Sequence, residues 1–149
     1  ARAGPVIVFD VARADPPREL PLLRLHADGH AIVRMRDGAA SETDFGRDRL
    51  RELLTFAVRK QDFRRIDARE IEAAIRTRTA ETGRMFEVAD APTSHVAIDL
   101  GTGRHAVTLF AAAMAATVFP SIAPLQRLRR IEMRLLATLS KLRTNAEER

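Results

Sequence analysis

Residues 21–36 read PLLRLHADGHAIVRMR, and this stretch decides how the first part of the chain folds. Apolar and polar residues alternate on both sides of a short Ala-Asp-Gly turn, as expected for two joined strands. A three-residue loop pairs Leu23 with Val33, so that apolar side chains meet on one face, whereas a two-residue loop pairs Leu23 with Arg34. The pattern therefore predicts a hairpin with the three-residue loop, and Gly29 suits its last position, where φ is usually positive.

The other face of this hairpin carries polar side chains. His26 lies directly opposite His30 in the predicted register, with Cβ atoms roughly 5 Å apart, which is close enough to share a metal ion. Arg24 and Arg34 lie on the same face, and fixed positive charges disfavour a bound cation. We interpret these residues as a polar surface patch, with a small metal-binding or enzymatic site at His26 and His30 as the alternative.

The run VAIDLGTG at residues 96–103 predicts a second hairpin. Pairing Val96 with Leu109 gathers apolar residues on one face and leaves residues 101–104 as the loop. The run also resembles the first phosphate loop of the actin and Hsp70 ATPases, which implies backbone amides and Thr102 around a nucleotide phosphate. That resemblance covers eight residues, and the family places this loop close to the start of its chain. We therefore interpret the run as a hairpin tip.

Spacing and capping signals predict four helices. One begins near Arg49, where leucines recur at helical intervals, and another runs from a capping box at Asp67 to a stop at Gly83, with Phe63 and Ile66 packed in the joint between them. A short alanine-rich helix is expected over residues 111–118, and a long helix over 124–143 with proline in its first turn.

The order of these segments predicts an α+β fold. We expect an antiparallel sheet of about five or six strands, built largely from hairpins, with the four helices mainly on one face. Further strands are expected over residues 5–11 and 40–45, and a short strand is one interpretation of residues 85–88. The length suits a single domain over residues 1–149, with residues 144–149 as an extended tail.

The composition is that of a folded domain and excludes several chemistries. Hydrophobic residues make up 46% of the chain and charged residues 30%, which indicates a packed core. Cysteine is absent, so disulfides, thiolate nucleophiles and cysteine-ligated zinc are excluded. Tyrosine and tryptophan are absent too, and the aromatic residues that stack on bases are therefore scarce. We expect no cofactor and no nucleic-acid partner.

The segment 106–125 carries no charged residue, and its length of about 20 residues matches a membrane-spanning helix. Its first residues continue a strand pattern, however, and Pro120 and Pro124 interrupt its end. We favour a buried strand followed by a buried helix, with a membrane-contacting segment as the alternative.

The basic excess is concentrated in the last helix. The formal net charge is +5, and residues 127–143 contain six basic residues against Glu132. Glu132 falls within the apolar stripe of this helix, so we expect an arginine or backbone donors beside it. Four cations line up next to that stripe, namely Arg127, Arg130, Arg134 and Lys141.

No catalytic residues are assigned. Ser94, His95, Asp90, Asp99 and His105 include the residue types of a hydrolase triad, but no strained turn presents a nucleophile. Neighbouring strand residues such as Ser94 and His95 point to opposite faces. The sequence identifies no small-molecule substrate.

We expect a non-enzymatic binding or accessory module, an exported subunit that docks onto a larger protein assembly. Residues 1–3 read Ala-Arg-Ala, which matches a signal-peptidase product and favours an exported or periplasmic location over a cytoplasmic one. Association with an anionic membrane through helix 124–143 is an alternative. The candidate partner-binding residues are Arg127, Arg130, Arg134, Lys141, Arg24, His26, His30 and Arg34.

Overall fold

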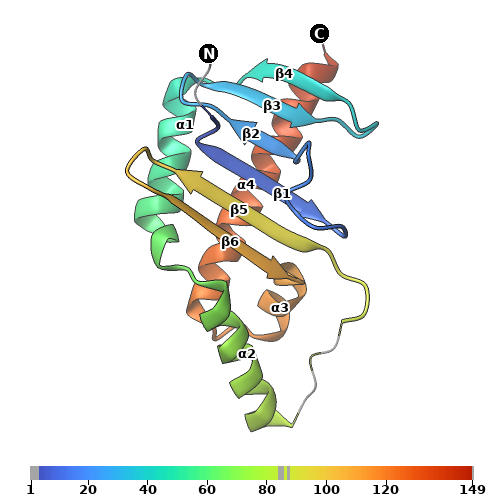
Figure 1. Cartoon of the computed structure of the whole chain (residues 1–149), viewed down its shortest axis with the longest axis vertical. Helices are drawn as coiled ribbons and strands as arrows, with labels where there is room; N and C mark the ends of the chain where they lie inside the picture. The colour runs from blue at the N-terminus through green and yellow to red at the C-terminus, as the bar shows by residue number, and fades with distance from the viewer. Residues whose placement is uncertain (1–3, 84–85, 87, 149) are drawn as a thin grey trace.

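The computed structural model describes residues 4–83, 86 and 88–148, and its centre is a six-stranded antiparallel sheet (Figure 1). The strands lie in the order β4-β3-β2-β1-β5-β6, and the predicted α+β fold is confirmed. Residues 85 and 87 of the expected short strand lie outside the described residues, as do residues 1–3. The strands are β1 (Ile7–Ala12), β2 (Leu23–Leu25), β3 (His30–Arg34), β4 (Ala40–Asp44), β5 (Thr93–Asp99) and β6 (Arg104–Phe110).

Helices cover one face of this sheet. Figure 1 shows α4 crossing behind the strands with α1 beside it, while α2 extends beyond the sheet. The other face of the sheet carries no helix in the described part of the chain, and we call it the open face. The helical elements are α1 (Arg47–Leu54), the π-helical segment η1 (Thr55–Lys60), the 3₁₀ turn η2 (Phe63–Arg65), α2 (Ala68–Thr82), α3 (Ala112–Val118) and α4 (Ala123–Glu147).

The first hairpin has the predicted register. Leu23 pairs with Val33, and Gly29 closes the loop with a φ of 89°. The backbone N–H groups of Phe45 and Gly46 both donate to the Gly29 carbonyl, at 2.9 and 3.1 Å. These bonds fix the tip of the first hairpin to the start of α1.

The second hairpin forms, but its predicted register is wrong. Val96 pairs with Val107 and not with Leu109, because the turn lies one residue earlier than expected. Side-chain direction repeats every two residues, so both registers give the same apolar face and the apolar pattern cannot distinguish them. The turn itself decides: the Gly101 N–H donates to Asp99 Oδ1 at 2.9 Å, an arrangement that starts the reversal at the aspartate.

The ends of α2 follow their sequence signals. Asp67 accepts a hydrogen bond from the Arg69 N–H at 2.8 Å, and Gly83 ends the helix with a φ of 68°. Phe63 and Ile66, which we expected between the first two helices, are completely buried. The capping residues therefore fix where α2 begins and ends, and the two apolar residues before it join it to the core.

The last helix is longer than predicted. We expected a helix over 124–143 and an extended tail over 144–149, but α4 continues through Glu147. No glycine or proline follows Arg143, so the sequence holds no signal that would stop the helix there. Near this end the Arg143 Nε donates to the backbone carbonyl of Arg34 at 2.8 Å, which ties α4 to β3.

The core lies between the inner face of the sheet and the helices. The uncharged segment 106–125 contains most of β6, all of α3 and the start of α4, so the expected strand and short helix are both present. Within the described ranges, no helix is long and apolar enough to cross a membrane. The predicted apolar stripe of α4 is buried throughout and consists of Leu125, Leu128, Ile131, Leu135, Leu139 and Leu142.

Candidate functional site

The eight candidate partner-binding residues lie on two separate faces of the molecule. In β2, Leu23 and Leu25 point into the core, so Arg24 between them points to the open face. The other hairpin residues of the set share that face, whereas the four cations of α4 lie on the side where the helices pack. The structure therefore does not bring the two groups together.

The two arginines of the open-face group hold the connection between β1 and β2. The Arg24 side chain donates to the Glu19 carbonyl at 2.6 Å, and the Arg34 side chain donates to the Leu20 carbonyl at 3.3 Å. Both arginines are half-buried. Their contacts support a structural role on this face of the sheet.

The two histidines of the open-face group lie close together, as predicted. The ring centroids of His26 and His30 are 5.4 Å apart, and His30 Nε2 is 3.2 Å from Glu42 Oε1. In the part of the chain that the structure describes, no group of three or more His, Cys, Asp and Glu side chains is placed to hold a metal ion. The geometry thus gives the metal-site alternative no complete ligand set.

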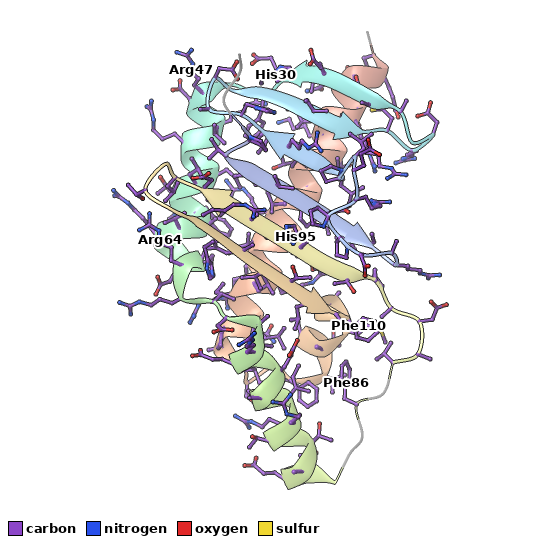
Figure 2. All side chains as sticks on the ribbon, in the orientation of Figure 1. His30, Arg47, Arg64, Phe86, His95 and Phe110 are labelled. Atoms are coloured by element: carbon purple, nitrogen blue, oxygen red, sulfur yellow. The ribbon has the colours of Figure 1, made fainter. Side chains whose placement is uncertain are left out.

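Ser94 and His95 point to opposite faces of β5, as their adjacency predicted. The Ser94 hydroxyl donates to Glu132 on the core side. His95, which is labelled in Figure 2, lies on the open face, where its Nδ1 is 2.7 Å from Thr108 Oγ1. Arg129 also donates to Glu132, so the expected arginine partner of this buried carboxylate is confirmed. Ser94 and His95 therefore do not form a nucleophile and base pair.

A second polar group is buried on the open face around Asp10 and His95. Burial lowers the pKa of His95 below its ordinary value, the nearby Arg104 lowers it further, and Asp10 partly opposes both. Burial alone would raise the pKa of Asp10, but hydrogen bonds from Arg18 outweigh it and leave the pKa below its ordinary value. The Arg18 Nη2 donates to Asp10 Oδ1 at 2.6 Å. This pairing stabilises an otherwise unfavourable buried charge.

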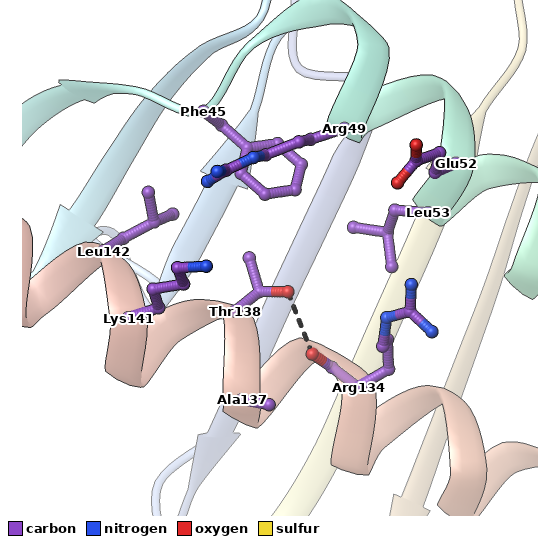
Figure 3. Close-up of a pocket in the computed structure, with 9 residues that line it drawn as sticks. All are labelled: Phe45, Arg49, Glu52, Leu53, Arg134, Ala137, Thr138, Lys141 and Leu142. Atoms are coloured by element: carbon purple, nitrogen blue, oxygen red, sulfur yellow. Dashed lines mark hydrogen bonds between the residues drawn. The ribbon is translucent and has the colours of Figure 1, made fainter.

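A groove lies between α1 and α4 on the helical side of the molecule, and Figure 3 shows one end of it. Arg49 and Glu52 line the wall formed by α1, and Arg134 and Lys141 line the wall formed by α4. This end has a volume of about 260 Å³. Its apolar lining consists of Phe45, Leu53, Ala137 and Leu142.

The groove continues along η1 as a second hollow of about 410 Å³, and both hollows share Glu52 and Arg134. The Arg134 guanidinium carbon lies 4.8 Å from the centre of the Phe56 ring, a cation–π contact that holds this arginine in place. We call the two hollows together the basic groove. Five cationic side chains line it against the single carboxylate of Glu52: Arg49, Arg51, Lys60, Arg134 and Lys141.

Only part of the predicted α4 set belongs to the basic groove. Arg134 and Lys141 line it. Arg130 is exposed, and its Nη1 lies 3.5 Å from Gln61 Oε1 at the end of η1. Arg127 is half-buried, and its Nε atom is buried without a hydrogen-bond partner among the described residues. Arg127 is therefore less available to a partner than the other three.

Sequence reasoning missed the half of the groove that α1 and η1 provide. The leucine spacing predicted a helix from about Arg49, but it assigned no neighbour to the charged face that carries Arg51 and Glu52. Periodicity shows which face of a helix is polar, but it does not show which other helix lies beside that face. The one relevant signal in the sequence was that both segments are positively charged. That signal does not show that the segments lie side by side.

Comparison of the chain with protein families, with curated proteins and with solved structures found no match. Within the described residues, the basic groove is lined by side chains from α1, η1 and α4. It combines a concave shape, an apolar floor and a charge of predominantly one sign.

Proposed function

We propose that this chain is a non-enzymatic binding module whose basic groove holds an acidic segment of a protein partner. The observation that carries the proposal is the charge on the two walls, where five cations face one groove that contains a single carboxylate. Cations held close together repel one another, and an anionic partner relieves that repulsion. The same charge attracts an acidic partner over a distance and speeds its association.

The apolar floor supports an amphipathic partner over a purely acidic one. Leu53 and Leu142 are buried beneath the charged walls, and Phe45 is half-buried beside them. A partner's apolar side chain placed over this floor would lose water contact, which contributes roughly 25 cal/mol per Å² of apolar surface. Arg134 and Lys141 lie about 10 Å apart along the axis of α4. A short acidic helix with one apolar stripe matches this spacing and chemistry.

Association with an anionic membrane is the competing function. A membrane surface is broad and nearly flat, whereas the apolar residues here lie at the floor of a groove between charged walls. The chain also lacks Trp and Tyr, the side chains that usually anchor proteins at the membrane interface. Both observations support a protein segment as the occupant.

A fluorescent amphipathic peptide made of Glu and Leu tests the proposal by fluorescence anisotropy. We expect saturable binding that weakens as salt is added, because the screening length falls from about 30 Å at 0.01 M to about 10 Å at 0.1 M salt. Reversing two wall charges with Arg134→Glu and Lys141→Glu should weaken binding about tenfold or more.

The matched control reverses two exposed arginines on α2, Arg76→Glu and Arg78→Glu, which do not line the basic groove. We expect this control to keep its peptide affinity within about twofold, since distant exposed charges are screened. Equal losses in the two variants would contradict the proposal, because net charge alone would then explain the binding. Binding to anionic vesicles without binding to the peptide would support the membrane function instead.

A further inference from the structure

A second cavity lies on the other side of α1, between that helix and the tips of the two hairpins. Its volume is about 520 Å³, within the range of about 300–1,000 Å³ that is typical of small-molecule sites. Ala27 from the first hairpin loop and Gly101 from the second contribute to its wall. We call it the hairpin-tip cavity.

The hairpin-tip cavity has an apolar body and a cationic rim. Arg47 and Arg51 are one helical turn apart on α1, so they project from the same side of the helix. Both are exposed. The apolar residues lining the cavity are Pro5, Val6, Ala27, Leu50, Leu54 and Leu100.

Two carboxylates lie near this rim and offset part of its positive charge. Asp99 lines the cavity, but its Oδ1 accepts the Gly101 N–H at 2.9 Å and is engaged in the turn. Asp48 Oδ1 lies 3.8 Å from Arg51 Nη1. Both side chains are largely exposed, so this ion pair is weak and screened. The planar guanidinium groups of the rim therefore remain suited to bind a carboxylate or phosphate.

The wall that Ala27 provides is already in place before any ligand binds. The Gly29 carbonyl accepts hydrogen bonds from the N–H groups of Phe45 and Gly46, which hold the loop against the start of α1. A site whose walls are fixed loses little conformational entropy when a ligand binds. The cavity thus combines a preformed shape with a charge that selects the ligand.

We infer that the hairpin-tip cavity binds a small anionic amphiphile. Arg47 and Arg51 hold its carboxylate or phosphate head, and its short alkyl chain lies against the leucines of the cavity. This site opens on the other side of α1 from the basic groove, and Arg51 lines both. Arg47 lines the hairpin-tip cavity, whereas Arg49 lines the basic groove from the opposite side of the helix.

Titration with sodium octanoate, followed by amide NMR spectra, tests this inference. We expect saturable shifts at Ala27, Leu54 and Gly101, which line the cavity. Hexanoate should bind more weakly, by up to about fourfold for each methylene removed. Heptylammonium, which has the same alkyl chain and the opposite charge, should bind about tenfold more weakly. Equal binding of octanoate and heptylammonium, or shifts confined to other parts of the molecule, would overturn the inference.

Two single substitutions on α1 separate this site from the basic groove. Arg47→Glu should weaken octanoate binding about fivefold and leave binding of the acidic peptide unchanged. Arg49→Glu should weaken binding of the acidic peptide and leave octanoate binding unchanged. Both residues are exposed, and amide spectra verify that each variant stays folded. If Arg47→Glu leaves octanoate binding intact, the hairpin-tip cavity is not an anion site. Peptide binding tests the proposed function of the basic groove separately.

Discussion

Gly29 joins the first hairpin to α1 through a contact that only glycine permits. Its φ is 89°, and a Cβ atom at this position would lie 2.7 Å from the Arg47 backbone nitrogen and 2.8 Å from the Gly46 carbonyl carbon. The sequence predicted the positive φ, because the residue closes a three-residue loop. It could not predict the contact with α1, because the two segments are far apart in the chain and no local pattern relates them.

Gly29→Ala should therefore destabilise the fold more than the same change at Gly38. Gly38 has nearly the same φ, 91°, but a Cβ there would approach only the flexible end of Arg34, at 3.8 Å. We expect Gly38→Ala to lower the free energy of unfolding by about 1–2 kcal/mol through backbone strain alone. Gly29→Ala adds a clash with backbone atoms and should cost about 3 kcal/mol or more. Urea denaturation measures both, and equal losses would show that the contact is unimportant.

At the scale of elements, α4 shows what an amphipathic pattern can and cannot predict. The pattern predicted which residues are buried and that Glu132 must have a partner. It pointed to an arginine, since Arg129 lies one turn away, but it could not identify Ser94, because no local pattern places β5 against α4. The second hairpin shows a related limit, because a shift of two residues preserves the apolar face and only the turn chemistry at Asp99 selects the register.

Because Glu132 accepts hydrogen bonds from Ser94 on β5 and from Arg129, substitutions of Glu132 should measurably change the stability of the fold. Glu132→Ala leaves the buried Ser94 hydroxyl without its acceptor and opens a void, so we expect a loss of about 2 kcal/mol in the free energy of unfolding. The loss stays below that of a completely buried ion pair because the Arg129 side chain is 28% exposed and can regain water. Glu132→Gln keeps the size and an acceptor oxygen and should cost about half as much. Urea denaturation measures both variants. If Glu132→Ala is as stable as the unchanged protein, the contacts of Glu132 with Ser94 and Arg129 do not stabilise the fold.

At the scale of the whole molecule, the sheet has two unlike faces. The helical side carries the basic groove, and the open face carries the histidines and the arginines of the first hairpin. The fold class could be predicted because strand alternation and helical periodicity are local properties. The basic groove could be predicted only in part: Arg134 and Lys141 came from the pattern of α4, but the packing of α1 beside α4 is a tertiary contact.

The central claim is that the basic groove binds an acidic segment, and mapping the bound peptide on the protein tests it most directly. Amide NMR spectra recorded with increasing amounts of the Glu/Leu peptide report which backbone positions change. We expect the largest shifts in two stretches that form opposite walls of the groove, residues 49–56 and 134–142. Shifts concentrated on the open face over residues 24–34, with the groove unchanged, would contradict the claim.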